Sequence, residues 1–258
     1  MRPTSHGGTT LLAGLLIVGS SLLAWAAEPQ PTPGKQVASS TTIKDAGDDG
    51  QEREVTLRYW LFVPADYAAD ETKQWPLLLF LHGSGERGDD LEIVKKHGPP
   101  KLVEAKPNFP CVTISPQCPQ DTRWNAAELA KLVESVANNL RIDRRRLYVT
   151  GLSMGGSGTW SLLAEHPGLF AAAVPICGRG DLAQLDKIAK TPVWVTVGGK
   201  DSEKTVKANE EIVAALKKAG GQVEFTLYPE LEHDCWTATY EDPKVWEWLL
   251  SHRRAAKE

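Results

Sequence analysis

The stretch VTGLSMGGSGTW, residues 149–160, determines how the rest of the sequence is interpreted. Its centre matches the pattern G-x-S-x-G, with Ser153 between Gly151 and Gly155. The run RLYVT that leads into it is rich in β-branched and aromatic residues and predicts a strand, whereas the segment GTWSLLAEH that leads out predicts a helix. A serine on a sharp strand-to-helix turn is held exposed at the end of a sheet, where it can act as a nucleophile.

The glycines of this stretch have a geometric reason in such a turn. The serine takes a strained backbone conformation, and Gly151 and Gly155 have no Cβ that would clash where the chain reverses. Gly156 and Gly158 let the following helix approach its neighbours closely. A merely flexible glycine turn would not require apolar elements on both sides. Because a five-residue pattern also arises by chance, the assignment of Ser153 depends on the rest of the chain.

Apolar, β-branched runs alternate with segments of helical periodicity along the chain. Strands are predicted at residues 55–64, 76–83, 111–116, 146–150, 170–177, 191–199 and 222–229. Helices are predicted at residues 125–140, 158–166, 207–221 and 243–254. Such alternation predicts an α/β protein with a mostly parallel sheet and helices on both faces. Only about fourteen residues separate the strands that end near Cys177 and begin near Thr191, which leaves no room for a lid domain.

Polar residues follow four of the predicted strands, at the edge where ligands bind in a parallel sheet. They are the HGSG segment at residues 82–85, Ser153, Asp201 and His233. The order Ser, Asp, His along the chain is the order found in the α/β-hydrolase fold. In that arrangement His233 takes the proton of Ser153, and Asp201 orients the imidazole. We therefore predict a catalytic triad of Ser153, Asp201 and His233.

The triad acid has rivals in the same part of the sequence. Asp181, Glu203 and Asp234 are the other acidic residues close to the ends of late strands. Asp234 directly follows His233, which places its carboxylate poorly for a hydrogen bond to that imidazole. Asp201 comes shortly after a predicted strand and two glycines that permit a tight turn, and it is therefore the preferred acid.

Two further residues are predicted to form the oxyanion hole. The backbone N–H groups of Ser84 and Met154 would bind the negative oxygen of a tetrahedral intermediate. His82 precedes Ser84 in the same loop and is interpreted as a buried histidine that braces the loop, in preference to a direct catalytic role.

The first residues are typical of a targeting segment. Arg2 precedes the apolar run LLAGLLIVGSSLLAWA at residues 11–26, which ends in the cleavage pattern Ala24-Trp25-Ala26. The alternative is an uncleaved membrane anchor, but the run is short for a span and contains glycines and serines. The mature chain is therefore expected to be exported, periplasmic or secreted, without stable membrane insertion. The predicted organisation is a signal peptide at residues 1–26, a disordered or extended segment at 27–50 and a catalytic domain at 51–258.

The composition of the 258 residues is that of a soluble globular protein, with a formal net charge of −4. The densest basic run, RIDRRRL at residues 141–147, is interpreted as a solvated turn, so nucleic acid is not an expected partner. No His/Cys cluster has zinc spacing, and we expect neither a metal nor a cofactor. The oligomeric state stays open, and so does disulfide formation among Cys111, Cys118, Cys177 and Cys235.

Four segments together resemble a known family. PLLLFLHGSGERGDD, GLSMGGSGTW, VGGKD and LEHDCW are similar to the small, lidless α/β-hydrolases of the phospholipase/carboxylesterase and dienelactone-hydrolase-like group. Within that group the chain resembles the exported branch of predicted peptidases and feruloyl-esterase-like proteins. The resemblance extends from about Val55 to Arg254 and implies the same triad of Ser153, Asp201 and His233.

Two departures from the family pattern stand out. Many relatives carry a valine-proline pair soon after the acid, whereas this chain reads DSEKTV from Asp201. Dienelactone hydrolases proper use a cysteine nucleophile, whereas this chain has Ser153. The first departure affects the expected shape of the acid loop.

The expected activity is hydrolysis of carboxylic esters through an acyl-enzyme. A site without a lid suits small-molecule or polymer-attached esters, with polysaccharide-linked or aromatic acyl esters as candidates. Trp124 and Trp236 fall in loops that border the predicted site and could stack on a sugar or an aromatic acyl group. The alternative is that each packs beneath its own loop. Two other functions stay open: a serine peptidase or amidase of the prolyl-oligopeptidase-like type, and a non-catalytic binding protein on a hydrolase fold.

Overall fold

The structure is a computed structural model that describes Met1, residues 31–46 and residues 52–255. Its centre is an eight-stranded sheet in the order β1-β2-β4-β3-β5-β6-β7-β8. The strands are β1 (Gln36–Ala46), β2 (Glu52–Phe62), β3 (Trp75–Leu81), β4 (Val112–Pro116), β5 (Ile142–Leu152), β6 (Ala172–Ile176), β7 (Val193–Gly198) and β8 (Val223–Tyr228). β2 is antiparallel to both of its neighbours, and all other pairs are parallel. The predicted mostly parallel sheet is confirmed.

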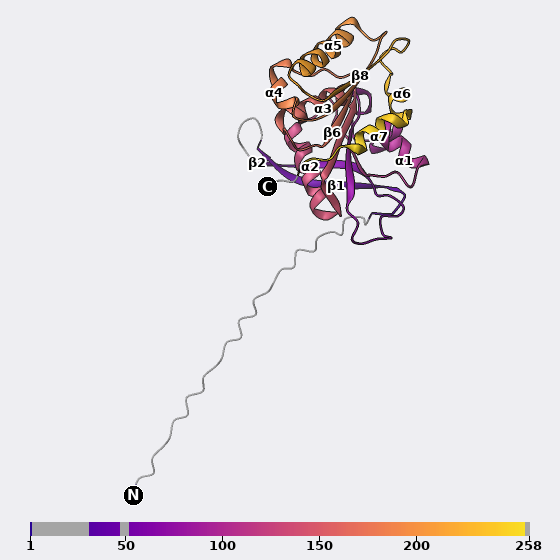
Figure 1. Ribbon diagram of the computed structural model, residues 1–258. Coiled ribbons are helices and arrows are strands. Elements are labelled where there is room, and N and C mark those ends of the chain that lie inside the picture. The colour runs from indigo at the N-terminus through magenta and orange to yellow at the C-terminus, as the bar shows by residue number, and fades with distance from the viewer. Residues whose placement is uncertain (2–30, 47–51, 256–258) are drawn as a thin grey trace.

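Helices cover both faces of this sheet (Figure 1). The α-helices are α1 (Gly98–Ala105), α2 (Ala126–Asn139), α3 (Met154–Glu165), α4 (Leu185–Ile188), α5 (Glu203–Lys218), α6 (Trp236–Glu241) and α7 (Pro243–Ser251). Three short 3₁₀ helices are η1 (Ser84–Glu86), η2 (Leu91–Lys96) and η3 (Leu182–Gln184). Residues of α2, α3, α4 and α5 pack in one hydrophobic core, and residues of η2, α1, α6 and α7 pack in another.

The central strand β3 shows why the sheet needs helices on both sides. Every residue of β3 is buried. Because successive side chains of a strand point to opposite faces, Leu77 and Leu79 join the core under α2 and α3, whereas Leu78 and Phe80 join the core under α1 and α7. The uninterrupted apolar run of this segment is the signature of a strand buried on both faces, as the sequence predicted.

The first strand was not predicted. β1 has the sequence QVASSTTIKDA and pairs with β2 from Gln36 opposite Phe62 to Ala46 opposite Glu52. It lies inside residues 27–50, for which a disordered or extended segment was expected, so the sheet begins before residue 51. The predicted signal peptide at residues 1–26 lies outside the described residues, apart from Met1.

The connection from β6 to β7 is short. In the described part of the chain it contains only η3 and α4, so no lid domain is inserted there, as predicted. None of the helices in residues 31–46 and 52–255 is long and apolar enough to cross a membrane. The candidate site lies at the carboxyl ends of the parallel strands and is formed by residues of the connections that follow them.

Candidate active site

Ser153 occupies the turn between β5 and α3. Its backbone angles are φ 54° and ψ −113°, a conformation that residues with a side chain rarely adopt. Its N–H donates to the carbonyl oxygen of Ile176, 2.9 Å away. A Cβ on Gly155 would lie 1.9 Å from the carbonyl oxygen of Leu81, so only glycine lets α3 sit this close to β3. The turn thus holds the serine at the carboxyl end of the sheet.

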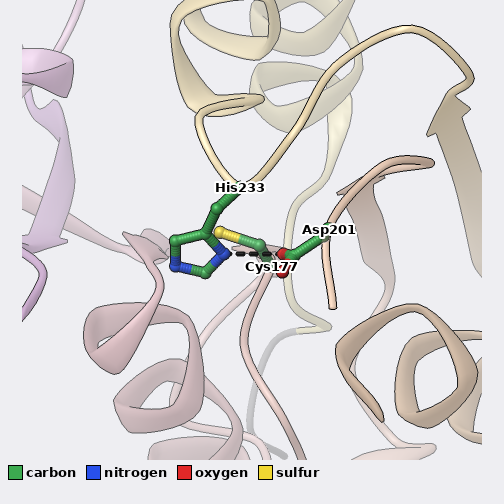
Figure 2. A group of neighbouring side chains, drawn as sticks. All are labelled: Cys177, Asp201 and His233. Carbon is green, nitrogen blue, oxygen red and sulfur yellow. Dashed lines mark hydrogen bonds and ion pairs between the residues drawn. The ribbon is translucent and has the colours of Figure 1, made fainter. Parts of the chain in front are cut away.

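The structure brings the three predicted triad residues into one chain of hydrogen bonds. Ser153 Oγ lies 2.9 Å from Nε2 of His233, and Nδ1 of His233 lies 2.6 Å from Oδ2 of Asp201. Asp201 comes from the loop between β7 and α5, and His233 comes from the loop between β8 and α6 (Figure 2). The Asp201 side chain is 6% exposed and the His233 side chain is 46% exposed, so solvent reaches the imidazole but hardly reaches the carboxylate.

A second close backbone contact positions the histidine loop. A Cβ on Gly198, the last residue of β7, would lie 1.9 Å from the carbonyl oxygen of Glu232. The glycine therefore lets the residue before His233 rest directly on the end of β7, next to the Asp201 loop. The loop that reads DSEKTV still delivers the Asp201 carboxylate to His233 without the valine-proline pair.

Two of the three rival acids have hydrogen-bond partners elsewhere, and the third begins a helix. The carboxylate of Asp181 accepts from the N–H of Ala183 at the start of η3, and that of Asp234 accepts from the hydroxyl of Thr237. Glu203 is the first residue of α5. Of the four candidate acids, Asp201 is the one whose carboxylate forms a hydrogen bond with the imidazole of His233.

Cys177 lies beside the acid and the histidine (Figure 2). It ends the β6 region with a φ of 42°, and its Sγ lies within 4.8 Å of potential ligand atoms of Asp201 and His233. A hydrogen bond with the thiol of Cys235, together with burial, raises the pKa of the Cys177 thiol. A metal at these three donors would require loss of that thiol proton and of the Asp201–His233 hydrogen bond. All four cysteines of the chain are free and buried.

The two residues predicted for the oxyanion hole line the same cavity as Ser153. Ser84 begins η1 and Met154 begins α3, and both border a cavity of about 250 Å³ that also contacts His233. As the first residue of a helix, Met154 has a backbone N–H without a partner inside the helix, on the side where the helix dipole favours negative charge. The positions of both residues are compatible with the predicted role.

His82 braces the loop that carries Ser84. It is 1% exposed, its Nδ1 lies 2.6 Å from the carbonyl oxygen of Gly83, and its Nε2 accepts from the N–H of Cys118 at 3.0 Å. Burial lowers the pKa of His82 to about 4, so the imidazole is neutral at pH 7. A neutral ring can donate through Nδ1 and accept through Nε2, and it ties the loop after β3 to the loop after β4.

Both predicted substrate-binding tryptophans contact a histidine. Trp124 is half-buried, and its indole N–H donates to the carbonyl oxygen of His82 at 3.1 Å. Trp236 packs edge-on against His233 with ring centroids 5.5 Å apart, and its indole nitrogen is buried without a hydrogen-bond partner. Among the described residues, the lining of the 250 Å³ cavity includes neither ring. A role of these tryptophans in substrate binding stays a prediction.

Three arginines at this site were not identified from the sequence. Arg87, Arg123 and Arg179 line the cavity together with Ser153. They lie in the loops that follow β3, β4 and β6. The rule that selected Ser153, Asp201 and His233, that residues after parallel strands meet at one edge, selects these arginines as well. The rule alone does not separate them from other charged loop residues, because nothing in the local sequence around each arginine marks it as part of a cavity.

Comparison with known proteins agrees with this geometry. A sequence profile of the dienelactone hydrolase family matches residues 119–255. A probable carboxylesterase of Oryza sativa subsp. japonica is 24% identical over 233 residues, which cover 76% of this chain and 85% of the relative. A poly(3-hydroxyalkanoate) depolymerase C of Paucimonas lemoignei is 42% identical over 53 residues, 20% of this chain and 13% of the relative. This chain thus spans only a small part of the depolymerase.

Solved structures show the same fold. A thermostable esterase superposes with a TM-score of 0.70 at 32% sequence identity, over 86% of this chain and 64% of the esterase. Feruloyl esterases and dipeptidyl peptidases share the fold at identities between 13% and 18%. The family profile extends over more than half of the chain and includes the nucleophile turn, the acid loop and the histidine loop. The chain therefore belongs to the dienelactone hydrolase family.

Proposed function

We propose that this protein is a serine hydrolase that cleaves carboxylic esters through an acyl-enzyme on Ser153. The observation that carries the proposal is the continuous hydrogen-bond chain from Ser153 through His233 to Asp201. The esterase names of its sequence and structural relatives support an ester as the substrate. The triad itself and the identity of the ester are our inference from the geometry.

The chemistry follows from the positions of the three side chains. Ser153 Oγ attacks the ester carbonyl carbon while Nε2 of His233 accepts the hydroxyl proton. The imidazolium then gives this proton to the leaving alkoxide, and the acyl group stays on Ser153. Water repeats the sequence, with His233 again as the base, and releases the carboxylic acid. Asp201 holds the Nδ1–H and stabilises the positive ring.

The oxyanion is stabilised at the end of α3. In each half of the reaction the carbonyl oxygen becomes negative, and it points toward the backbone N–H groups of Met154 and Ser84. These donors are fixed by the helix start and by the loop that His82 braces. Because their orientation exists before the substrate binds, no reorganisation is needed when charge develops.

A fluorophosphonate probe tests the nucleophile. We expect the probe to label Ser153 alone, located by mass spectrometry of the digested protein, and labelling to stop in Ser153→Ala. Ser161→Ala is the matched control on the same helix, because its hydroxyl donates to the carbonyl oxygen of Ser157 within α3. Labelling at Ser84 or Ser157 would refute the assignment.

Paired substrates test the reaction type. The 4-nitrophenyl ester and the 4-nitroanilide of one acyl group differ only in the leaving group. We expect hydrolysis of the ester and a much slower reaction of the anilide. A faster reaction with the anilide would favour the peptidase or amidase alternative.

We also propose that the chain is exported and that its mature form begins at Ala27. The support is the sequence pattern of residues 11–26. The mass of the protein recovered from outside the cytoplasm of an expressing bacterium tests this. A mass that retains Met1 would contradict cleavage.

A further inference from the structure

Two buried thiols meet next to the proposed triad. Cys177 directly follows β6, and Cys235 directly precedes α6. Both residues belong to the same hydrophobic core, and they are 3% and 0% exposed. The thiol of Cys177 forms a hydrogen bond with the thiol of Cys235. The fold therefore brings together two cysteines that are far apart in the sequence.

The backbone holds both cysteines at the same residue of β7. The N–H of Cys177 donates to the carbonyl oxygen of Thr196 at 2.8 Å. The hydroxyl of Thr239 lies 3.0 Å from the hydroxyl of Thr196 and 2.9 Å from the carbonyl oxygen of Cys235. Cys177 is thus attached to Thr196 directly, and Cys235 is attached through Thr239. The contact between the two thiols is therefore fixed by the backbone and does not depend on side-chain rotamers alone.

Each cysteine is also adjacent to a part of the proposed catalytic machinery. The N–H of Ser153 donates to the carbonyl oxygen of the residue before Cys177, and the N–H of Cys235 donates to the carbonyl oxygen of His233, both at 2.9 Å. The Sγ atom of Cys177 lies within 4.8 Å of potential ligand atoms of Asp201 and His233 (Figure 2). A bond between the two sulfur atoms would therefore join the support of the nucleophile turn to the loop of the base.

The other two cysteines cannot form a disulfide with each other. Cys111 directly precedes β4, and Cys118 follows the end of the same strand. Seven residues of extended chain span roughly 23 Å, whereas the Cα atoms of a disulfide lie within about 7 Å of each other. The thiol of Cys118 is instead 3.3 Å from the hydroxyl of Thr122. Intramolecular pairing of these two residues is therefore excluded by the strand between them.

We propose that a disulfide oxidant, such as oxidised glutathione, converts Cys177 and Cys235 into a disulfide that fastens the loop of His233 to the end of β6. The thiolate of one cysteine attacks a sulfur of the oxidant and releases one glutathione thiolate. The thiolate of the other cysteine then attacks the protein sulfur of this mixed disulfide and releases the second glutathione. Two electrons pass to the oxidant, and the two thiol protons end on two molecules of reduced glutathione.

Burial determines when this reaction takes place. The hydrogen bond with Cys235, together with burial, raises the pKa of the Cys177 thiol, so its thiolate is rare in the folded protein. An oxidant also has little access to sulfur atoms that are 3% and 0% exposed. We therefore expect slow oxidation of the folded protein and fast oxidation while the chain folds. The same burial protects the finished disulfide from reduction.

The expected consequence is a more stable site. A disulfide across a long stretch of chain limits the freedom of the unfolded state and stabilises the folded one. We expect the midpoint of thermal unfolding to be about 5–10 °C higher for the oxidised protein than for the reduced protein. The effect on ester hydrolysis rests on the proposed function, whereas formation of the disulfide does not.

Peptide mapping tests the bond itself. The purified protein is unfolded in urea with a reductant, refolded in buffers of reduced and oxidised glutathione, alkylated at low pH and digested without reduction. We expect one cross-linked peptide that joins Cys177 to Cys235, and alkylated Cys111 and Cys118. Alkylated Cys177 and Cys235 in the most oxidising buffer would overturn the proposal. A cross-link to Cys111 or Cys118 would overturn it as well.

Variants assign the gain in stability to this pair. In Cys235→Ala the oxidised and reduced proteins are expected to unfold at the same temperature. Cys111→Ala is the matched control, because Cys111 is equally buried and lies at the start of β4. It is expected to keep the difference between the two forms, even if both unfold at a lower temperature. A difference that persists in Cys235→Ala would overturn the assignment.

Activity separates this proposal from the proposed function. At a temperature between the two unfolding midpoints, the oxidised wild type is expected to keep hydrolysing a 4-nitrophenyl ester after the reduced protein has lost its activity. A large loss of kcat/KM on oxidation at 25 °C would mean that the bond displaces His233, and would overturn the fastening role. If neither form hydrolyses an ester, the proposed function fails, while the peptide map and the unfolding midpoints still decide the disulfide.

Discussion

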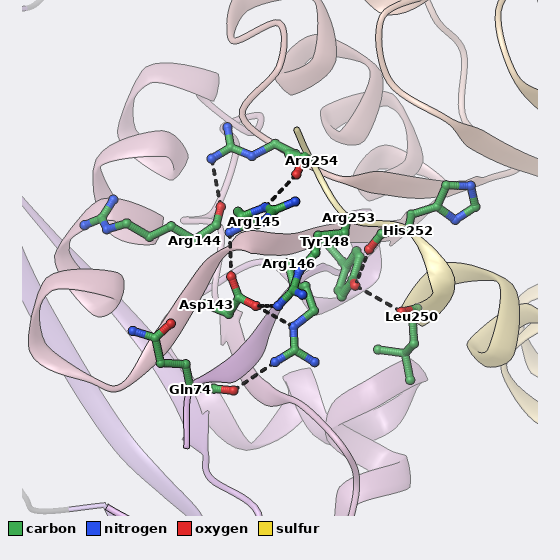
Figure 3. A network of polar contacts seen from close by, with 10 residues as sticks. All are labelled: Gln74, Asp143, Arg144, Arg145, Arg146, Tyr148, Leu250, His252, Arg253 and Arg254. Carbon is green, nitrogen blue, oxygen red and sulfur yellow. Dashed lines mark hydrogen bonds and ion pairs between the residues drawn. The ribbon is translucent and has the colours of Figure 1, made fainter. Parts of the chain in front are cut away.

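Arginines cluster at both ends of the sheet, and the two clusters differ in their contacts with carboxylates. At the amino end of β5 they surround Asp143, whose side chain is 8% exposed (Figure 3). Its carboxylate accepts hydrogen bonds from the side chains of Arg146 and Arg253 and from the backbone N–H of Arg145. Arg145 and Arg146 belong to β5 itself, whereas Arg253 attaches the C-terminal residues to the start of this strand. At the carboxyl end, Arg87, Arg123 and Arg179 line a cavity whose lining includes no carboxylate among the described residues.

A buried carboxylate is therefore the feature that marks the arginines at the amino end as a structural cluster. The amino end also has the larger hollow, about 800 Å³, between α2, the loop near His166 and the C-terminal residues around Arg254. That hollow borders the start of β5, whereas Ser153 follows the end of this strand. Volume alone would select the amino end of the sheet, whereas the hydrogen-bonded side chains of Ser153, His233 and Asp201 lie at the carboxyl end, where we propose that the chemistry takes place.

The largest expected effect is at the carboxyl end, in the triad acid. Asp201→Asn removes the acceptor for Nδ1–H of His233 and is expected to lower kcat by about 10⁴-fold, because the imidazole loses its orientation and tautomer. Thermal unfolding is expected to change little. Glu203→Gln and Asp234→Asn are matched controls, since the imidazole of His233 forms its carboxylate hydrogen bond with Asp201. Activity lost in Glu203→Gln and kept in Asp201→Asn would move the acid two residues along the loop.

The next effect is at the amino end and concerns stability. Asp143→Ala removes the carboxylate that Arg146 and Arg253 share and is expected to lower the free energy of unfolding by about 1.5–3 kcal/mol, because both guanidinium groups are partly exposed and can be solvated. Urea denaturation measures this loss, and kcat/KM of the folded variant should stay near that of the wild type. Asp66→Ala is the control, because its ion pair with Lys73 is exposed and is expected to contribute less than about 1 kcal/mol. A large loss of activity per folded molecule would mean that the two ends are coupled.

These two ends also differ in what sequence alone can predict. Buried strands such as β3 could be predicted because a short, continuous apolar run is stable only where both of its faces are buried. β1 was missed because its serines and threonines look like a linker, and it becomes a strand only through its pairing with β2. The triad was predictable because each member follows a different strand, and its side-chain distances needed the fold. The arginines of the cavity were missed because nothing in the local sequence separates them from charged residues that face solvent.

A pH-dependent effect should arise from the loop that His82 braces. The unfolded imidazole titrates near pH 6.5, and burial lowers the pKa in the folded protein to about 4. Between these values the unfolded chain binds a proton that the folded chain does not, so stability is full above pH 6.5 and falls as the pH approaches 4. The loss corresponds to about 3 kcal/mol. Denaturation curves across this range measure it.

The variant His82→Asn checks the source of this slope. Its stability is expected to be lower at pH 7 but to depend less on pH between 6.5 and 4. Parallel curves for the wild type and His82→Asn would refute the assignment to His82.

Asp143 is not expected to contribute to the slope between pH 6.5 and 4. Burial tends to raise the pKa of Asp143, but hydrogen bonds from Arg253, Arg145 and Arg146 outweigh burial and lower it below 3.8. Asp143 therefore contributes stability above pH 3.8 that is lost only as the pH falls further.

The smallest expected effect distinguishes the two tryptophans at the site. Trp124→Phe removes the hydrogen bond to the carbonyl oxygen of His82 and is expected to cost about 1 kcal/mol of stability. Trp236→Phe removes a buried N–H that has no partner and is expected to be closer to neutral. Thermal unfolding of the two variants gives the comparison. A higher KM in either variant, with stability unchanged, would show that its ring contacts the substrate.

The strained backbone conformation of Ser153 lowers stability, but the proposed turnover needs this serine. Selection for stability and selection for activity therefore act on this residue in opposite directions. Its φ of 54° and ψ of −113° are rarely adopted by residues other than glycine, and holding a serine there costs about 1–3 kcal/mol. A variant library screened only for survival at high temperature should therefore enrich Ser153→Gly, which relieves this cost and removes the nucleophile. Populations screened for hydrolysis should keep serine and gain thermal tolerance at other positions. The residue found at position 153 then shows whether a population was selected for thermal survival or for hydrolysis.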